Sequence, residues 1–233
     1  MTSLVQPTRI LVVGGGGREH ALAWKLGSEP GVNEVTVAPG SDAIAREPRV
    51  RVVPGLDPLD PAAVVALARE RASELVVIGP EAPLAAGVAD ALAGAGIPAF
   101  GPTAVAARIE TSKAFCREIA AAAGVPMAEG RSFRPGEHEA ALAYAASLAP
   151  RGVVVKADGL AGGKGVVVCR SSEEAEAAIR SMAGPLVVEE RLEGPEASVI
   201  GVADGRLAVA LPIARDHKRL GDGNTGPNTG GMG

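Results

Sequence analysis

Short apolar runs alternate with helix-forming stretches over the first hundred residues, and this alternation constrains the fold more than any other feature. Strands buried on both faces read as continuous apolar runs, and strands that alternate with helices are joined by right-handed crossovers in a parallel sheet. We expect helices at residues 19–26, after the N-cap Asp60, and from Pro83. The pattern predicts an open, doubly wound α/β domain whose strands are residues 10–13, 34–38, 51–53, 75–78 and 97–100.

The order of elements changes near Gly101, after which strands follow strands directly. A helix from Ser112 to Ala123 has its stop signal in Gly124, because glycine is common just past a helix end. We place the domains at residues 1–103 and 104–233, and predict a mixed sheet in the second. Its expected helices are 136–148 and 173–182, and its strands are 127–133, 153–157, 166–169, 186–190, 197–202 and 207–213, the last two joined by an Asp204-Gly205 turn.

Composition excludes several classes of protein. The 23 Lys and Arg residues against 27 Asp and Glu give a net charge of −4, and the basic residues are scattered, so we expect no nucleic-acid partner. No apolar run approaches the ~20 residues that a membrane span needs, so we expect no membrane insertion. The two cysteines, Cys116 and Cys169, lack disulfide or zinc spacing, which favours a reducing, cytoplasmic setting.

Four glycines, Gly14 to Gly17, stand between the first strand and the first helix. Glycine lets backbone N–H groups approach an anion, and a helix N-terminus adds partial positive charge. The dinucleotide fingerprint G-x-G-x-x-G fails at its third glycine, where Glu19 stands, and the second strand ends without a carboxylate, so NAD is disfavoured. Two interpretations stay open: a phosphate site that Arg18 completes, or a tight structural turn.

A second glycine-rich segment, from Lys156 to Gly165, lies between two apolar runs. It differs from a P-loop, because three residues rather than four separate Gly159 from Gly163, and a β-run follows in place of a helix. The segment therefore reads as the loop of a hairpin between antiparallel strands. We interpret it as a lid over a triphosphate, with Lys156 at its base, rather than as an ordinary hairpin with a solvated Lys164.

Two further stretches bear on nucleotide binding. The run 186–192 is an apolar strand that ends in Glu189 and Glu190, and Glu196 follows. Its backbone groups suit an adenine edge and a carboxylate suits the sugar; surface acids at a strand end are the plain alternative. The last thirteen residues hold six glycines, which is typical either of a disordered tail or of a nest of N–H groups for an anion. Composition leaves this second choice open.

Several motifs together resemble the phosphoribosylamine–glycine ligase family of purine synthesis. They are GGREHA at 16–21, GPEAPL at 79–84, SKAF at 112–115, KADGLA at 156–161 with GKG at 163–165, and GPNTGGMG at 226–233. The resemblance covers essentially the whole chain. It implies a Rossmann-like pre-ATP-grasp domain followed by an incomplete α+β ATP-grasp domain, with ATP as cofactor and Mg²⁺ or Mn²⁺ as its metal.

The resemblance also implies that ATP phosphorylates glycine, and that 5-phosphoribosylamine attacks the acyl phosphate to give an amide, ADP and phosphate. Lys156 and Asp216 are then expected to be catalytic. The expected nucleotide-binding residues are Lys113, Lys156, Gly159, Gly162, Gly163, Lys164, Glu189, Glu190, Leu192 and Glu196. The expected substrate-binding residues are Gly15, Gly16, Gly17, Arg18, Glu81, Asp216, Asn228, Thr229, Gly230 and Gly231.

Members of this family continue beyond the position of Gly233 with the acidic and asparagine ligands for magnesium. We therefore expect no metal ligand within this chain, and we expect ligase activity to require the remaining segment. The connection between Met182 and Leu186 is also shorter than in relatives. Two alternatives stay open: a catalytically silent ATP-binding protein, and an ATP-grasp ligase that joins a different carboxylate and amine.

Overall fold

The computed structural model describes residues 6–160, 165–215, 217–223 and 225–232. The chain forms two compact units. The first contains the chain up to Met127 together with Asp158–Leu160, and the second contains the remainder. A short piece from the second half of the chain thus belongs with the first unit.

The first unit is built on a parallel sheet of five strands in the order β3-β2-β1-β4-β5. In the middle, Ile10 of β1 pairs with Val35 of β2 and Leu75 of β4. The strand order reverses between β1 and β4, so the predicted doubly wound parallel domain is confirmed. The strands are β1 (Arg9–Gly14), β2 (Glu34–Pro39), β3 (Val50–Val52), β4 (Leu75–Ile78) and β5 (Ala99–Phe100).

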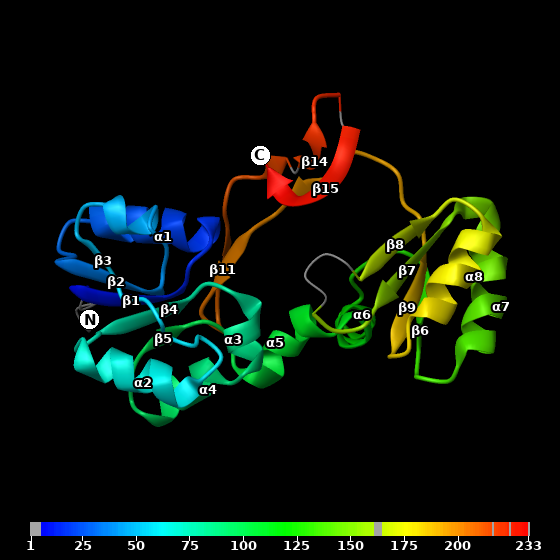
Figure 1. The fold of residues 1–233 in the computed structure, drawn as a ribbon. Coiled ribbons are helices and arrows are strands. Elements are labelled where there is room, and N and C mark those ends of the chain that lie inside the picture. The colour runs from blue at the N-terminus through cyan, green and yellow to red at the C-terminus, as the bar shows by residue number, and fades with distance from the viewer. Residues whose placement is uncertain (1–5, 161–164, 216, 224, 233) are drawn as a thin grey trace. The chain divides into compact units, whose positions relative to one another are not determined.

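Helices cover both faces of this sheet (Figure 1). Because side chains alternate along a strand, Ile10 and Val12 pack on the side of α1, whereas Leu11 and Val13 pack on the side of α2 and α4. No helix in the described part of the chain is both long enough and apolar enough to cross a membrane. The helices are α1 (Gly17–Ser28), η1 (Ile44–Arg46), α2 (Pro61–Glu70), α3 (Glu81–Ala85), α4 (Val88–Gly94), α5 (Ala104–Thr111) and α6 (Lys113–Ala122).

The α-helices of the first unit differ from the sequence prediction at two places. The single helix expected from Pro83 is two helices, because Gly87 has a φ of +85° and separates α3 from α4. Helix α5 is absent from the prediction; Thr103 caps it by accepting the N–H of Ala106. The predicted helix α6 is confirmed, with Ser112 as its N-cap.

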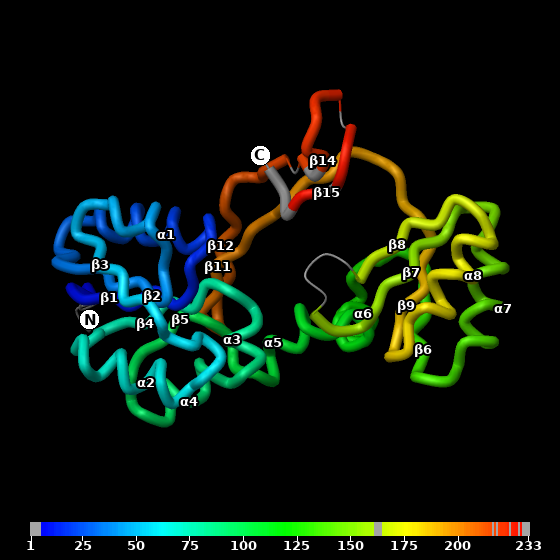
Figure 2. The backbone as a smooth tube through the Cα atoms, in the orientation of Figure 1, coloured from blue at the N-terminus to red at the C-terminus, as the bar shows by residue number. Residues whose placement is uncertain are grey.

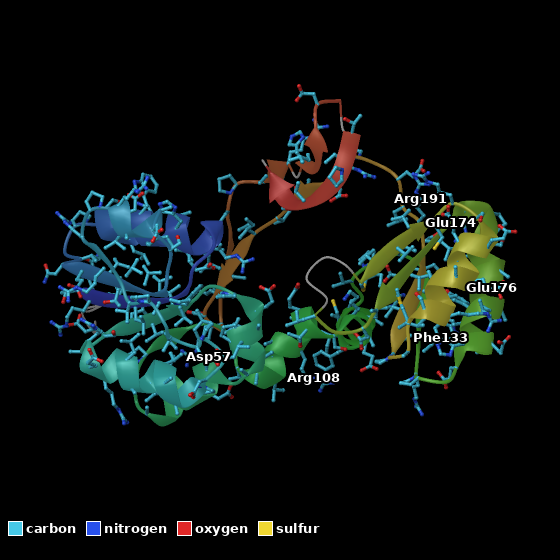
Figure 3. All side chains as sticks on the ribbon, viewed as in Figure 1. Asp57, Arg108, Phe133, Glu174, Glu176 and Arg191 are labelled. Atoms are coloured by element: carbon cyan, nitrogen blue, oxygen red, sulfur yellow. The ribbon has the colours of Figure 1, made fainter. Side chains whose placement is uncertain are left out.

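The second unit contains a sheet of four strands in the order β6-β9-β7-β8. The predicted mixed sheet is wrong, because every neighbouring pair in it is antiparallel. Helices α7 and α8 cover one face of it (Figure 2). Phe133, labelled in Figure 3, packs in the core between this face and the helices, with Leu148, Val155 and Ile179. The elements are β6 (Gly130–Phe133), α7 (His138–Leu148), η2 (Ala149–Arg151), β7 (Val153–Ala157), β8 (Val166–Cys169), α8 (Ser172–Ser181) and β9 (Leu186–Glu190).

Three two-stranded ladders follow β9 in the chain. The predicted turn at Asp204-Gly205 is confirmed: Asp204 Oδ1 accepts the N–H groups of Leu207 and Arg206, each at 2.8 Å, and these bonds lower the pKa of Asp204. The glycine-rich tail, which composition left open, forms a hairpin. The pairs are β10 (Ala197–Ser198) with β13 (Ala214–Arg215), β11 (Gly201–Ala203) with β12 (Ala208–Ala210), and β14 (His217–Gly221) with β15 (Thr225–Met232).

Glu74 ties the start of β1 to the residue before β4. Its Oε2 accepts the N–H of Thr8 at 2.6 Å, and its Oε1 lies 2.8 Å from Nη2 of Arg9. The backbone hydrogen bond from Thr8 is the largest of the causes that hold the pKa of this carboxyl below its usual value. The ionised form of Glu74 therefore stabilises the folded unit.

We predict that Glu74→Gln lowers Tm at neutral pH and has little effect in acid. A carboxyl whose pKa is lowered by folding stabilises the native state above its unfolded pKa of about 4.3, and this contribution is lost as pH falls through the folded pKa. Thermal unfolding from about pH 7 to about pH 3 measures the difference. Glu70→Gln, in an exposed carboxylate at the end of α2, is the control; the same pH profile for both variants contradicts the prediction.

Candidate functional site

The first glycine loop, between β1 and α1, is organised around a buried carboxylate. Glu19 is only 4% exposed, and its Oε2 accepts the N–H of Gly16 at 2.7 Å. A Cβ built on Gly79, in the loop after β4, falls 2.1 Å from Glu19 Oε1, and one on Gly14 falls 2.6 Å from Glu19 Cγ. The Glu19 side chain thus fills the space between the two loops and requires glycine on both sides.

Glu19 is not among the site residues predicted from the sequence. The signal was present, however, because Glu19 is the residue that breaks the dinucleotide fingerprint. With the N–H of Gly16 already bonded to a carboxylate, the loop offers an external anion one donor fewer than the fingerprint loop does.

Arg18 and Glu81, both predicted to bind substrate, lie together at one cavity of the first unit. Arg18 Nη1 donates to the carbonyl of Gly79 at 2.6 Å and lies 3.4 Å from Glu81 Oε2. The cavity measures about 390 Å³ and follows the carboxyl end of β4, where the strand order reverses and open α/β sheets bind ligands. Its lining residues are Arg18, Gly79, Glu81, Leu84, Pro102, Ala107, Ile109 and Glu110.

Lys156 and Glu189, both assigned to the nucleotide, form an ion pair in the second unit. The register pairs Val154 with Glu189 and Lys156 with Val187, so both charged side chains lie on the face opposite α7 and α8. Glu189 is buried, whereas the Lys156 side chain is 29% exposed. The predicted antiparallel pairing around the glycine loop is confirmed, since Lys156 lies opposite Val166 of β8.

Glu190 is adjacent to Glu189 but occupies the other face of β9, because side chains alternate along a strand. Its Oε2 accepts a hydrogen bond from Arg151 Nη1 at 2.8 Å, and its Oε1 accepts the N–H of Glu129 at 2.8 Å. The hydrogen bond from Arg151 also lowers the pKa of Glu129. The side chain of Glu190 thus joins the end of β9 to Arg151 and to the residue before β6. Two other predicted nucleotide residues, Leu192 and Glu196, lie beyond β9 and are exposed.

Lys113, the other predicted phosphate lysine, begins helix α6. Its Nζ donates to the carbonyl of Gly159 at 3.0 Å, and its backbone N–H donates to Asp158 at 2.6 Å. Asp158 is a second carboxylate that the sequence analysis did not assign. The sequence did contain a signal for it, because Asp158 stands between a predicted strand and the glycine-rich loop.

Some predicted site residues lie outside the described residues or are described only as backbone. Gly162, Gly163, Lys164 and Asp216 lie outside them. The predicted substrate loop falls in β15, which contains Asn228, Thr229, Gly230 and Gly231 and pairs with β14. Within the described ranges, no group of three or more His, Cys, Asp and Glu side chains is arranged to hold a metal ion.

The first unit is a doubly wound parallel domain, and the second contains a four-stranded antiparallel sheet. In that sheet a buried glutamate pairs with a lysine that precedes a glycine-rich loop. These features together define the ATP-grasp class. The comparison with known families agrees. Residues 8–110 match the N domain of phosphoribosylglycinamide synthetase, and residues 111–233 match its ATP-grasp (A) domain. The chain belongs to the phosphoribosylglycinamide synthetase family.

Individual relatives support this placement. The chain is 47% identical over 236 residues to a phosphoribosylamine–glycine ligase from Rhodopirellula baltica, with 96% of this chain and 53% of the relative covered. It superposes on the ligase of the same name from Thermotoga maritima with a TM-score of 0.74 at 30% identity, covering 96% and 54%. The superposition on an ADP complex of N5-carboxyaminoimidazole ribonucleotide synthetase has a TM-score of 0.66 at 25% identity, and it covers 93% of this chain and 56% of that one. The chain spans about half the length of these relatives.

We predict that Gly79→Ala destabilises the first unit through Glu19. The new methyl group forces the Glu19 side chain to move and break its bond to Gly16, which lowers the free energy of unfolding by roughly 1–3 kcal/mol. Urea unfolding measures this. In a Glu19→Ala background the obstructing carboxylate is gone, so the same glycine substitution costs clearly less.

The matched control is Gly94→Ala in α4, where an added Cβ meets nothing within 4 Å. Alanine is favoured over glycine in a helix, so this variant is at least as stable as the wild type. Equal costs for Gly79→Ala with and without Glu19 contradict the assigned contact.

Proposed function

We propose that this chain carries the substrate and nucleotide sites of an ATP-dependent ligase that joins glycine to 5-phosphoribosylamine. The observation that carries the proposal is the match of both units, over residues 8–233, to the two domains of one ligase family. The ADP bound to a structural neighbour at 25% identity supports the choice of nucleotide. The product is glycinamide ribonucleotide, an intermediate of purine synthesis.

The nucleotide lies on the open face of the second unit in this proposal. Lys156 contacts its phosphates. Residues Glu189 to Leu192, with Glu196, form the wall beside adenine and ribose. The ion pair between Lys156 and Glu189 supports this role, because it fixes the position of the ammonium on the open face of the sheet.

The reaction has two balanced steps. A carboxylate oxygen of glycine attacks the γ-phosphorus, the bond to the β,γ-bridging oxygen breaks, and ADP leaves. The amine nitrogen of phosphoribosylamine then attacks the carbonyl carbon of glycyl phosphate, phosphate leaves, and the nitrogen loses a proton. Lys156 offsets negative charge on the phosphoryl group during the first step. Asp216 and the loop Asn228–Gly231 face the reacting substrates.

The first unit binds phosphoribosylamine in this proposal. Its loop residues Gly15 to Arg18 and Glu81 face the ligand, with Arg18 on the phosphate and the N-terminus of α1 behind it. The cavity that Arg18 and Glu81 share supports this assignment, since it combines a cation and a carboxylate with apolar walls.

We further propose that turnover requires the part of the protein that corresponds to the other half of these relatives. The segment after β9 carries large apolar side chains that are exposed, among them Leu207 at 73%, Ile213 at 72% and Val199 at 67%, which lie between its short strands. Exposed apolar residues concentrated in one segment indicate a surface that further polypeptide covers. This observation favours a ligase completed by further chain over a self-sufficient ATP-binding protein.

We predict that Lys156→Ala abolishes turnover in the completed protein. ADP release that depends on both glycine and phosphoribosylamine falls by about 100-fold or more, because one preorganised cation at the transferring phosphoryl group is lost. A coupled assay for ADP measures it. Lys25→Ala, in an exposed lysine on α1, is the control and leaves the rate unchanged. Undiminished ADP release in the Lys156 variant contradicts the role of Lys156 at the phosphoryl group. If the unaltered protein releases ADP only when phosphoribosylamine is replaced by another amine, the protein is a different ligase.

A further inference from the structure

Glu110, in the last turn of α5, lines the cavity of the first unit that Arg18 and Glu81 share. It is not among the site residues predicted from the sequence. Ala107, one turn earlier on the same helix, is buried and lines the same cavity, so this face of α5 forms part of the cavity wall. The cavity therefore has a third charged residue beside the two already described.

A carboxylate at this position does not stabilise its own helix. The last carbonyl groups of a helix carry partial negative charge, so cations are favoured at this end and anions are not. Arg108, the basic residue of the same turn, places its guanidinium 4.1 Å from the centre of the Phe115 ring. Among the described residues, the Glu110 carboxylate has no hydrogen bond and no ion pair. A charge that conflicts with its helix and gains no contact is typical of a functional site.

The other two charged groups of the cavity are already paired with each other. Arg18 Nη1 donates to the carbonyl of Gly79 at 2.6 Å and lies 3.4 Å from Glu81 Oε2. A guanidinium has five N–H donors, so Arg18 keeps donors for a phosphate. The hydroxyl groups of a ligand need an acceptor instead. Glu110 is the carboxylate of this cavity that no group in the described part of the chain engages.

We propose that Glu110 is a specificity-determining residue that accepts hydrogen bonds from the ribose hydroxyl groups of the sugar phosphate held by Arg18. The inference rests on the proposed function, since it takes this cavity as the site of phosphoribosylamine. The two oxygens of a carboxylate match the two neighbouring hydroxyl groups of a ribose ring. The walls at Leu84, Pro102 and Ile109 are apolar and suit the ring itself, and the volume of about 390 Å³ is in the range of small-molecule sites.

The test is calorimetric binding of two probes to this chain, D-ribose 5-phosphate and 2-deoxy-D-ribose 5-phosphate. The deoxy sugar keeps the phosphate and lacks one of the two neighbouring hydroxyl groups. The wild type binds ribose 5-phosphate at least about tenfold more tightly than the deoxy sugar, because a hydrogen bond to a charged group is lost with the hydroxyl. In Glu110→Ala the acceptor is gone, so the affinity for ribose 5-phosphate falls to that for the deoxy sugar and the preference disappears.

The matched control is Glu70→Ala, the same change in the last residue of α2, which does not line the cavity. This variant keeps the preference for ribose. Thermal unfolding separates a binding role from a structural one. Glu110→Ala has a Tm at or above that of the wild type, because it removes an unpaired negative charge from the end of a helix and introduces a good helix former. A lower Tm, or a variant that does not fold, contradicts the proposed role.

The failure of this inference is distinguishable from the failure of the proposed function. Equal affinity of the wild type for the two sugars, which needs no variant to measure, overturns the role of Glu110, and so does a preference that Glu110→Ala retains. Loss of both sugars from Arg18→Ala shows in either case that the sugar phosphate site itself stands. Absence of ribose 5-phosphate binding to the wild type overturns both the site and the role of Glu110.

Discussion

The site in the first unit depends on one interaction, the hydrogen bond between the buried Glu19 carboxylate and the N–H of Gly16. It places negative charge at the N-terminus of α1 from within the chain and fills the space against Gly79. The neighbouring Arg18 is thereby directed along the Gly79 backbone to the cavity that it shares with Glu81. The same carboxylate explains why the loop departs from the dinucleotide fingerprint: the third glycine is replaced by the group that organises the loop.

Local sequence signals predicted most of the fold. The bounds predicted for four strands, 75–78, 153–157, 166–169 and 186–190, are those observed, because these β-branched runs are interrupted sharply by glycine, proline or charge. The prediction missed α5 and the break at Gly87, where small residues dominate both sides. Around Gly87 hydrophobic periodicity does not distinguish one helix from two, and packing decides. At α5 the N-cap Thr103 was an available signal.

The sequence predicted less of the site, for reasons that differ by residue. Strand alternation alone predicts that the side chains of Glu189 and Glu190 lie on opposite faces of the sheet, so this feature could be predicted from the sequence. The pairing of Lys156 with Glu189 needed the order of β7 and β9, which no local pattern gives. The bonds of Asp158 to α6 join segments about 45 residues apart, and no spacing rule connects an acid after a strand with a distant helix N-terminus.

The ion pair between Lys156 and Glu189 has a consequence for how an anion binds. A buried carboxylate without a partner is costly, so Glu189 holds Lys156 in place when the site is empty. An ammonium has three N–H donors, and a bond to one carboxylate does not exhaust them. Lys156 is therefore held in one orientation on the open face of the sheet. Around it this face carries Val154 and the half-exposed Val166 and Val168, so the ion pair is surrounded by apolar surface.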